Sequence, residues 1–451
     1  MNNHHLPDIL VLFPEPPIAQ IVFSDSHCIA DEPIDPYFRT ETLGLDLLPS
    51  ASDPINSQHI DSLRIDITSE DDADQAHLPG PLSQSIQLRR KEWACQIIHR
   101  LQRKAITPRS FTLCMDCDEI PLCNDTRLID AVRSSFLGIT QLNLWLQRED
   151  VTDLIPFVAS FPKLEVLALI CVSLYGEYED EEPGGVGALS RMLLPQSLQT
   201  FHFSPPTILS RGNLYPDLCE WISMHSSRME RHCVKELSYL CCDEPSSDIS
   251  ISVLNISDHI EELYLSFQDS IADALFCTRK ESEALRFQGK RPTRHRRVHY
   301  DLSHLHSLRT ITFYIPALRF DTPDHYILHT LVDRIQDTLS TVSSPDLENI
   351  IILVPEYYIT EVPPDLPVWY SLDAYLATVL SCPTRTKVNI CATPGDEDYE
   401  VCLGDEETRS KYLQTFQQCA RTGRIRFDGD FGTRLGSSGP TWNVLRQKPT
   451  A

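Results

Sequence analysis

The chain has 451 residues, of which 41% are hydrophobic and 23% charged, a balance typical of folded globular proteins. Its formal net charge is -25, from 39 basic and 64 acidic residues, which disfavours nucleic acid as a partner because the phosphate backbone would be repelled. No window approaches the roughly 20 apolar residues of a membrane-spanning helix, and the first residues lack a secretory signal pattern, so we expect no membrane partner.

Residues 1–82 are rich in prolines and scattered acidic residues. Two short apolar stretches interrupt them, at 18–23 and 63–67. We interpret 1–82 as an irregular, partly disordered N-terminal region that contains one or two strands. A long amphipathic helix is predicted next, over 83–104, because apolar residues recur there at helical spacing.

A unit then recurs in which a helical stretch leads through a short link into a strand of the form apolar-x-x-apolar-x-apolar. The middle apolar residues of ten such strands are Phe111, Leu142, Leu167, Phe201, Leu237, Leu263, Ile311, Ile350, Val388 and Ile425. The steps between them run from 25 to 48 residues. Regular leucine-rich repeats have shorter and more uniform periods, whereas these steps leave room for a helix and a loop in each unit.

Each unit has an apolar strand face and an apolar helix face that it cannot bury alone, so neighbouring units are expected to stack. The predicted fold class is α/β: an irregular, leucine-rich-repeat-like solenoid with a curved parallel sheet and helices on the outer face. The helix–strand repeat domain would cover 83–431, followed by a flexible tail at 432–451. A compact doubly wound sheet is the alternative, and it would require reversals in strand order.

Three segments carry a family resemblance: FPKLEVLAL at 161–169, LPQSLQTFHF at 194–203 and LRTITF at 308–313. The stretch at 419–427 continues the same strand pattern. Over about 105–430 the chain resembles the divergent leucine-rich-repeat region of fungal F-box-type proteins. The resemblance implies a protein-interaction scaffold that recognises substrates in an F-box-like ubiquitin-ligase system, with a ubiquitin-ligase adaptor among its protein partners.

The opening of an F-box is imitated by LPDILVLF at 6–13. Pro14, Pro16 and Pro17 follow at once, and a proline inside a helix costs roughly 3 kcal/mol. Binding to an adaptor and membership of a ubiquitin ligase both depend on this segment.

Sequence signatures of common enzymes are missing from the chain, including nucleophile elbows, phosphate-binding loops and metalloprotease motifs. Cys114 and Cys117, with Cys123 nearby, lack the second ligand pair that zinc sites usually need. We therefore predict no catalytic residues, no metal and no cofactor. The alternative is an enzyme whose active residues are too dispersed in the sequence to recognise.

The 15 cysteines do not indicate a disulfide framework, because their number is odd and the chain is long. Several lie inside apolar runs, where free cysteine behaves as a small buried hydrophobe: Cys95, Cys171, Cys219, Cys391 and Cys419. A reducing compartment, the cytoplasm or the nucleus, is therefore expected.

In each strand, the residues between the apolar positions should share the face of the sheet that the helices leave open. This row of candidate protein-binding residues comprises Asn143, Trp145, His202, Glu262, Tyr264, Thr312, Tyr314, Asn389, Arg424 and Arg426. Exposed Trp, Tyr and Arg are enriched in binding hot spots. Alternatively, loops cover the row and it has a structural role.

The longest inter-strand step contains a basic run, which is a sharp local contrast in so acidic a chain. Its cationic residues are Lys290, Arg291, Arg294, Arg296 and Arg297. One interpretation is a nuclear-import signal or a contact for an acidic partner, and the other is a solvated loop. We expect an exposed loop that trypsin cuts early.

Overall fold

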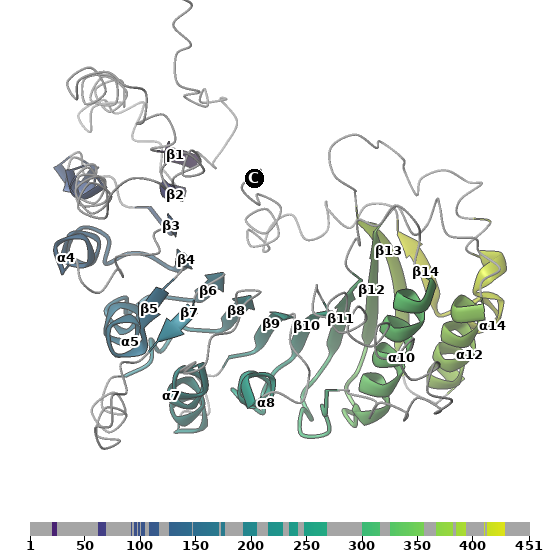
Figure 1. Ribbon diagram of the computed structural model, residues 1–451. Coiled ribbons are helices and arrows are strands. Elements are labelled where there is room, and N and C mark those ends of the chain that lie inside the picture. The colour runs from purple at the N-terminus through teal and green to yellow at the C-terminus, as the bar shows by residue number, and fades with distance from the viewer. Residues whose placement is uncertain are drawn as a thin grey trace, which may run out of the picture. The chain divides into compact units, whose positions relative to one another are not determined.

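A computed structural model of the whole chain gives the arrangement described below (Figure 1). The residues that it describes are 20–24, 62–68, 92, 94–96, 98–99, 101–103, 108–116, 126–146, 148–170, 173–175, 193–204, 215–228, 234–241, 248–267, 300–315, 325–355, 367–381, 385–393, 410 and 413–428.

The chain divides into two compact units, each of which is built from parallel strands and helices. The first comprises residues 1–200, 208–225 and 449–451, and the second comprises 201–207 and 226–448. Helices and parallel strands alternate along the described residues of both units, which confirms the predicted α/β class.

In the first unit, five strands are neighbours in the order in which they occur in the sequence, and each adjacent pair is parallel. They are β1 (Gln20–Ser24), β2 (Ser62–Thr68), β3 (Ser110–Asp116), β4 (Gln141–Leu146) and β6 (Val166–Ile170). A separate pair is formed by β5 (Arg148–Asp150) and β7 (Ser173–Tyr175). The helices are α4 (Thr126–Ser135), α5 (Val151–Ala159) and most of α7 (Tyr215–Arg228).

In the second unit the strand order again follows the sequence. The strands are most of β8 (Thr200–Ser204), β9 (Glu236–Cys241), β10 (Glu262–Phe267), β11 (Thr310–Tyr314), β12 (Asn349–Pro355), β13 (Lys387–Thr393) and β14 (Ile425–Asp428). The helices are α8 (Asp248–Leu254), α10 (His325–Thr341), α12 (Pro367–Ser381) and α14 (Gln417–Arg421). Neighbouring strands from β9 to β14 are parallel.

All ten strands predicted from the apolar pattern are present, and the N-terminal region, for which one or two strands were predicted, contains β1 and β2. Neither unit shows the reversal in strand order that a doubly wound sheet requires. The described residues between 92 and 103 are helical, with Ala94, Ile98 and Leu101 buried, which confirms the predicted helix over the part that is described.

The middle apolar residues of the pattern are paired across the strands. In the first unit Phe111 pairs with Leu142, which pairs with Leu167. The corresponding ladder in the second unit is Leu237, Leu263, Ile311, Ile350, Val388 and Ile425. Because the side-chain period of a strand is two residues, this register puts the apolar side chains of every strand on one face.

Hydrogen bonds connect the link before a strand to the link before the preceding strand, and one backbone carbonyl accepts two of them. In the second unit the Lys235 carbonyl accepts the N–H groups of Glu261 and Glu262, and the Glu261 carbonyl accepts those of Arg309 and Thr310. The same arrangement recurs in the first unit, at the carbonyl of Thr140. The repeat is therefore one of backbone geometry, although the sequence period is irregular.

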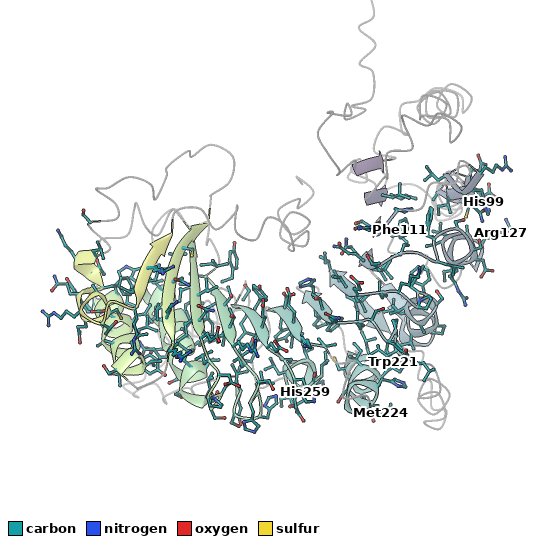
Figure 2. All side chains as sticks on the ribbon, turned by 180° about the vertical axis from the view of Figure 1, so that it is seen from behind. His99, Phe111, Arg127, Trp221, Met224 and His259 are labelled. Atoms are coloured by element: carbon teal, nitrogen blue, oxygen red, sulfur yellow. The ribbon has the colours of Figure 1, made fainter. Side chains whose placement is uncertain are left out.

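The helices pack on the apolar face of the strands, and Figure 1 shows α10, α12 and α14 together on one side of β11–β14. Phe111 on β3 and Trp221 on α7, both labelled in Figure 2, are fully buried. Phe111 also contacts Phe136, just after α4, with ring centroids 5.7 Å apart. None of the helices in the described ranges is long and apolar enough to cross a bilayer.

Candidate functional site

The candidate site lies on the strand face opposite the paired apolar residues. Its side chains come from the positions between them, and the register places these positions side by side. In the second unit the row contains Ser238, Tyr264, Thr312, Ile351, Asn389 and Arg426. The row is therefore continuous across six neighbouring strands.

In the first unit the corresponding row runs from Arg64 through Thr112 and Asn143 to Ala168, and the last three of these residues are closed off from solvent. Thr112, Asn143 and Ala168 are paired in register and all three are buried. The Asn143 Nδ2 group donates a hydrogen bond to Thr112 Oγ1 at 3.0 Å. This bond satisfies polar groups that would otherwise be costly to bury, so this row has a structural role in the arrangement seen here.

One end of the second unit's row is a buried polar cluster. His202 Nδ1 lies 2.7 Å from Ser238 Oγ, and both side chains are buried. Burial lowers the pKa of His202 from 6.5 to about 4, so the imidazole is neutral near pH 7. Tyr264 donates a hydrogen bond from its hydroxyl to Glu262 at 3.2 Å. Burial raises the pKa of Tyr264, and the charges of Glu236 and Glu262 raise it further.

Exposure increases along the row from β9 to β14. Tyr264 and Thr312 are only 8% and 1% exposed. Ile351 and Asn389 are half-buried, and Arg426 is exposed. The accessible part of the row therefore lies over β12–β14.

Three buried oxygen atoms on this face have no hydrogen-bond partner: Ser266 Oγ, Thr312 Oγ1 and Asn389 Oδ1. Thr312 and Asn389 belong to the row, and Ser266 lies two residues beyond Tyr264 on β10. A buried polar group without a partner costs about 1–3 kcal/mol. These atoms are thus candidates for hydrogen bonds to a bound molecule or to water.

The structure differs from the sequence prediction in how exposed the row is. Asn143, His202, Tyr264 and Thr312 were expected on an open face, but all four are buried. Strands about 4.8 Å apart allow longer neighbours to shield short side chains, and the alternating pattern along one strand does not reveal this. Glu262 is exposed as expected, and Tyr314 is half-buried.

Arg424, which was predicted to belong to the row, contacts a helix. It precedes β14, and its guanidinium group donates a hydrogen bond to the Leu380 carbonyl on α12 at 3.0 Å. It therefore reaches towards a helix C-terminus, where a cation is favoured. Trp145 is in β4, but its side chain lies outside the described residues, as does the whole basic run at 290–297.

Sequence reasoning missed Ser238, Ser266 and Ile351, which share the row's face. The available signal was positional, because each lies between apolar strand residues in the same way as the residues that were predicted. Ile351 lies within an apolar run, so the alternation of apolar and polar residues that marks the row's face is absent there. Within the described ranges there is no group of three or more potential metal ligands.

Comparison with known proteins found no protein-family model that matches the chain and no curated protein with significant sequence similarity.

Proposed function

We propose that this protein is a non-enzymatic protein-interaction scaffold of leucine-rich-repeat type. Its partner would bind the face of β11–β14 that carries Tyr314, Ile351, Asn389 and Arg426. The observation that carries the proposal is the accessible end of the row, where an aliphatic, an amide and an arginine side chain lie on neighbouring strands. The aromatic side chain of Tyr314 lies on the same face, two residues beyond Thr312 on β11. Aromatic and arginine residues dominate binding hot spots.

Hydrogen bonding supports a polypeptide as the bound molecule. The Oδ1 of Asn389, a half-buried residue, has no hydrogen-bond partner and can accept a hydrogen bond from a backbone N–H group. The apolar side chain of Ile351 is its neighbour in the register. A polypeptide offers both N–H donors and apolar side chains, so it matches this surface.

Site-specific photo-crosslinking tests the proposed face. A benzophenone side chain at Ile351 should crosslink a protein partner in cells that express the chain. The same group at Tyr370, which is 47% exposed on α12, serves as the control and should not. Equal crosslinking from both positions, or none from Ile351, would contradict binding at this face.

We further propose that the scaffold recognises substrates in an F-box-like ubiquitin-ligase system, in the cytoplasm or the nucleus. This rests on the resemblance of 105–430 to fungal F-box-type repeats and on the segment at 6–13, which lies outside the described residues. Free thiols at Cys95, Cys219, Cys391 and Cys419 are compatible with a reducing compartment. The full chain should bind a purified adaptor subunit, and substitution of Leu6 and Leu10 by Asp should abolish that binding. If the wild-type chain does not bind the adaptor, the proposal that it belongs to a ubiquitin ligase is contradicted.

A further inference from the structure

Basic side chains gather at the amino-terminal ends of the last two strands of the second unit. We call this group the basic edge; it consists of Arg385, Lys387, Arg421, Arg424 and Arg426. Over 385–393 and 413–428 there are five cationic residues and one acidic residue, Asp428. The whole chain, by contrast, has 39 basic and 64 acidic residues.

The cations of the basic edge are close together because of the strand register. Asn389 pairs with Arg426, so Lys387, two residues earlier on β13, is level with Arg424. Arg421 ends α14 just before β14 begins. Arg385, Lys387, Arg421 and Arg426 are exposed and form no ion pair with the described residues.

The edge of β14 that faces away from β13 offers backbone hydrogen bonds. Within the described strands, β14 ends the strand order and pairs only with β13. The Arg424 carbonyl accepts the Val388 N–H group at 3.0 Å, so this carbonyl and the backbone groups of Arg426 point to β13. Because successive residues of a strand point to opposite sides, those of Ile425 and Phe427 point to the open edge.

We propose that this edge binds an acidic, extended peptide segment of a partner protein, which adds to the sheet as a further strand beside β14. Backbone hydrogen bonds to Ile425 and Phe427 would supply affinity, and the basic edge would select acidic side chains. The basic edge shares Arg426 with the face described above, but the backbone groups that would bind the added strand belong to the edge of β14. The inference therefore does not depend on the proposed function.

Side-chain alternation defines the sequence that should bind. Arg426 is on the row's face of the sheet, whereas Ile425 pairs with Val388 on the apolar face and is half-buried. A strand added at the edge would alternate in the same way. The preferred peptide is therefore one in which Asp or Glu alternates with Val or Ile over at least four residues.

An alternative explanation of the basic edge is that its charges prevent self-association, as charges on edge strands often do. The two explanations differ in the affinity for acidic peptides that they predict. Cations that only repel a second copy of the edge would give no affinity for acidic peptides. The proposal requires such affinity, so one binding measurement distinguishes the two explanations.

The test uses the full chain, a fluorescent Glu-Val-Glu-Val-Glu-Val peptide and its Lys-Val counterpart. We expect the acidic peptide alone to bind, more weakly as salt rises, and to slow hydrogen exchange in the segment 424–428. Reversal of Arg421 and Arg426 to Glu should weaken binding by about tenfold or more. The matched control, Arg103→Glu with Arg133→Glu, makes the same charge change on exposed helical positions and should leave binding within about twofold.

Several outcomes would overturn the proposal. One is the absence of acidic-peptide binding by a folded wild-type chain. Another is binding that leaves exchange in 424–428 unchanged, which would place the peptide elsewhere. A third is a stable dimer whose 424–428 segment is already protected, which would make the edge an interface between copies of this chain. Arg421→Lys with Arg426→Lys keeps the charge and should keep binding, which guards against loss of binding through misfolding.

Discussion

The side chain of His202 shows how burial controls the chemistry of one residue. Its imidazole hydrogen-bonds Ser238 at 2.7 Å inside the second unit, and burial holds its pKa at about 4 instead of 6.5. The neutral imidazole fits this site, whereas the imidazolium would lose its hydration on burial. A histidine beside a serine can be part of a catalytic pair, but here it is better explained as a buried polar contact.

The shift of His202 makes stability depend on pH. Above about pH 6.5 the imidazole is neutral in both the folded and unfolded states. Between pH 6.5 and 4 only the unfolded state takes up the proton, so the free energy of unfolding should fall by about 3 kcal/mol across that window. Below pH 4 both states are protonated and this contribution stops changing.

Urea unfolding at a series of pH values checks this prediction. His202→Asn should lose the additional pH dependence between 6.5 and 4, because asparagine does not titrate. His259→Asn, at an exposed position, is the control and should behave as the wild-type chain does. Identical pH profiles for the wild type and His202→Asn would contradict a buried, neutral His202.

Among the elements, α14 is unusual because its amino terminus is satisfied from another helix. Its N-cap residue, Phe416, makes no side-chain capping bond. Asp373, which is buried on α12, accepts hydrogen bonds from the Gln418 and Cys419 N–H groups, both at 2.9 Å. Unsatisfied N–H groups in a first helical turn attract a carboxylate, so Asp373 fixes a helix of only five residues to its neighbour.

Replacing Asp373 should therefore detach α14. Asp373→Ala leaves two N–H groups unpaired, of which that of Cys419 is buried, and we expect it to lower the free energy of unfolding by about 2–4 kcal/mol. Asp333→Ala, at an exposed position on α10, should change it by less than about 0.5 kcal/mol. The measurement is urea unfolding of both variants. Equal stabilities would mean that other contacts hold α14 in place.

The strands were predictable from the sequence because each has a local cause. The apolar-x-x-apolar-x-apolar pattern located all ten, and its middle residues, such as Leu263 and Ile311, are paired directly. Asp373 was not predictable in the same way. It lies beside Leu372 within the apolar stripe of α12, and a carboxylate there indicates a buried partner without identifying it. The exposure of the row and the hydrogen bond from Arg424 to the Leu380 carbonyl were also not predictable, because both depend on residues distant in sequence.

At the scale of the whole molecule, the dominant electrostatic property is the excess of negative charge. A net charge of -25 implies mutual repulsion that a compact state must overcome. Local ion pairs relieve little of it, since Lys235 and Arg309 both contact the single carboxylate of Glu261, at 2.9 and 3.9 Å, and exposed pairs contribute about 0–1 kcal/mol each. Among the described residues, the basic edge is a local exception to this excess, and its charge favours acidic segments.

Salt should therefore stabilise the protein at low ionic strength. Raising sodium chloride from about 0.01 M to about 0.15 M shortens the screening length from about 30 Å to about 8 Å, which weakens repulsion between distant acidic groups. We expect the midpoint of thermal unfolding to rise by about 2–4 °C, equivalent to roughly 1 kcal/mol for units of this size, and to change little at higher salt. Asp258→Asn with Asp346→Asn, both at exposed positions, should reduce the rise, whereas Arg103→Gln should increase it. A midpoint that falls with added salt would show that attractive ion pairs outweigh the net repulsion in the folded state.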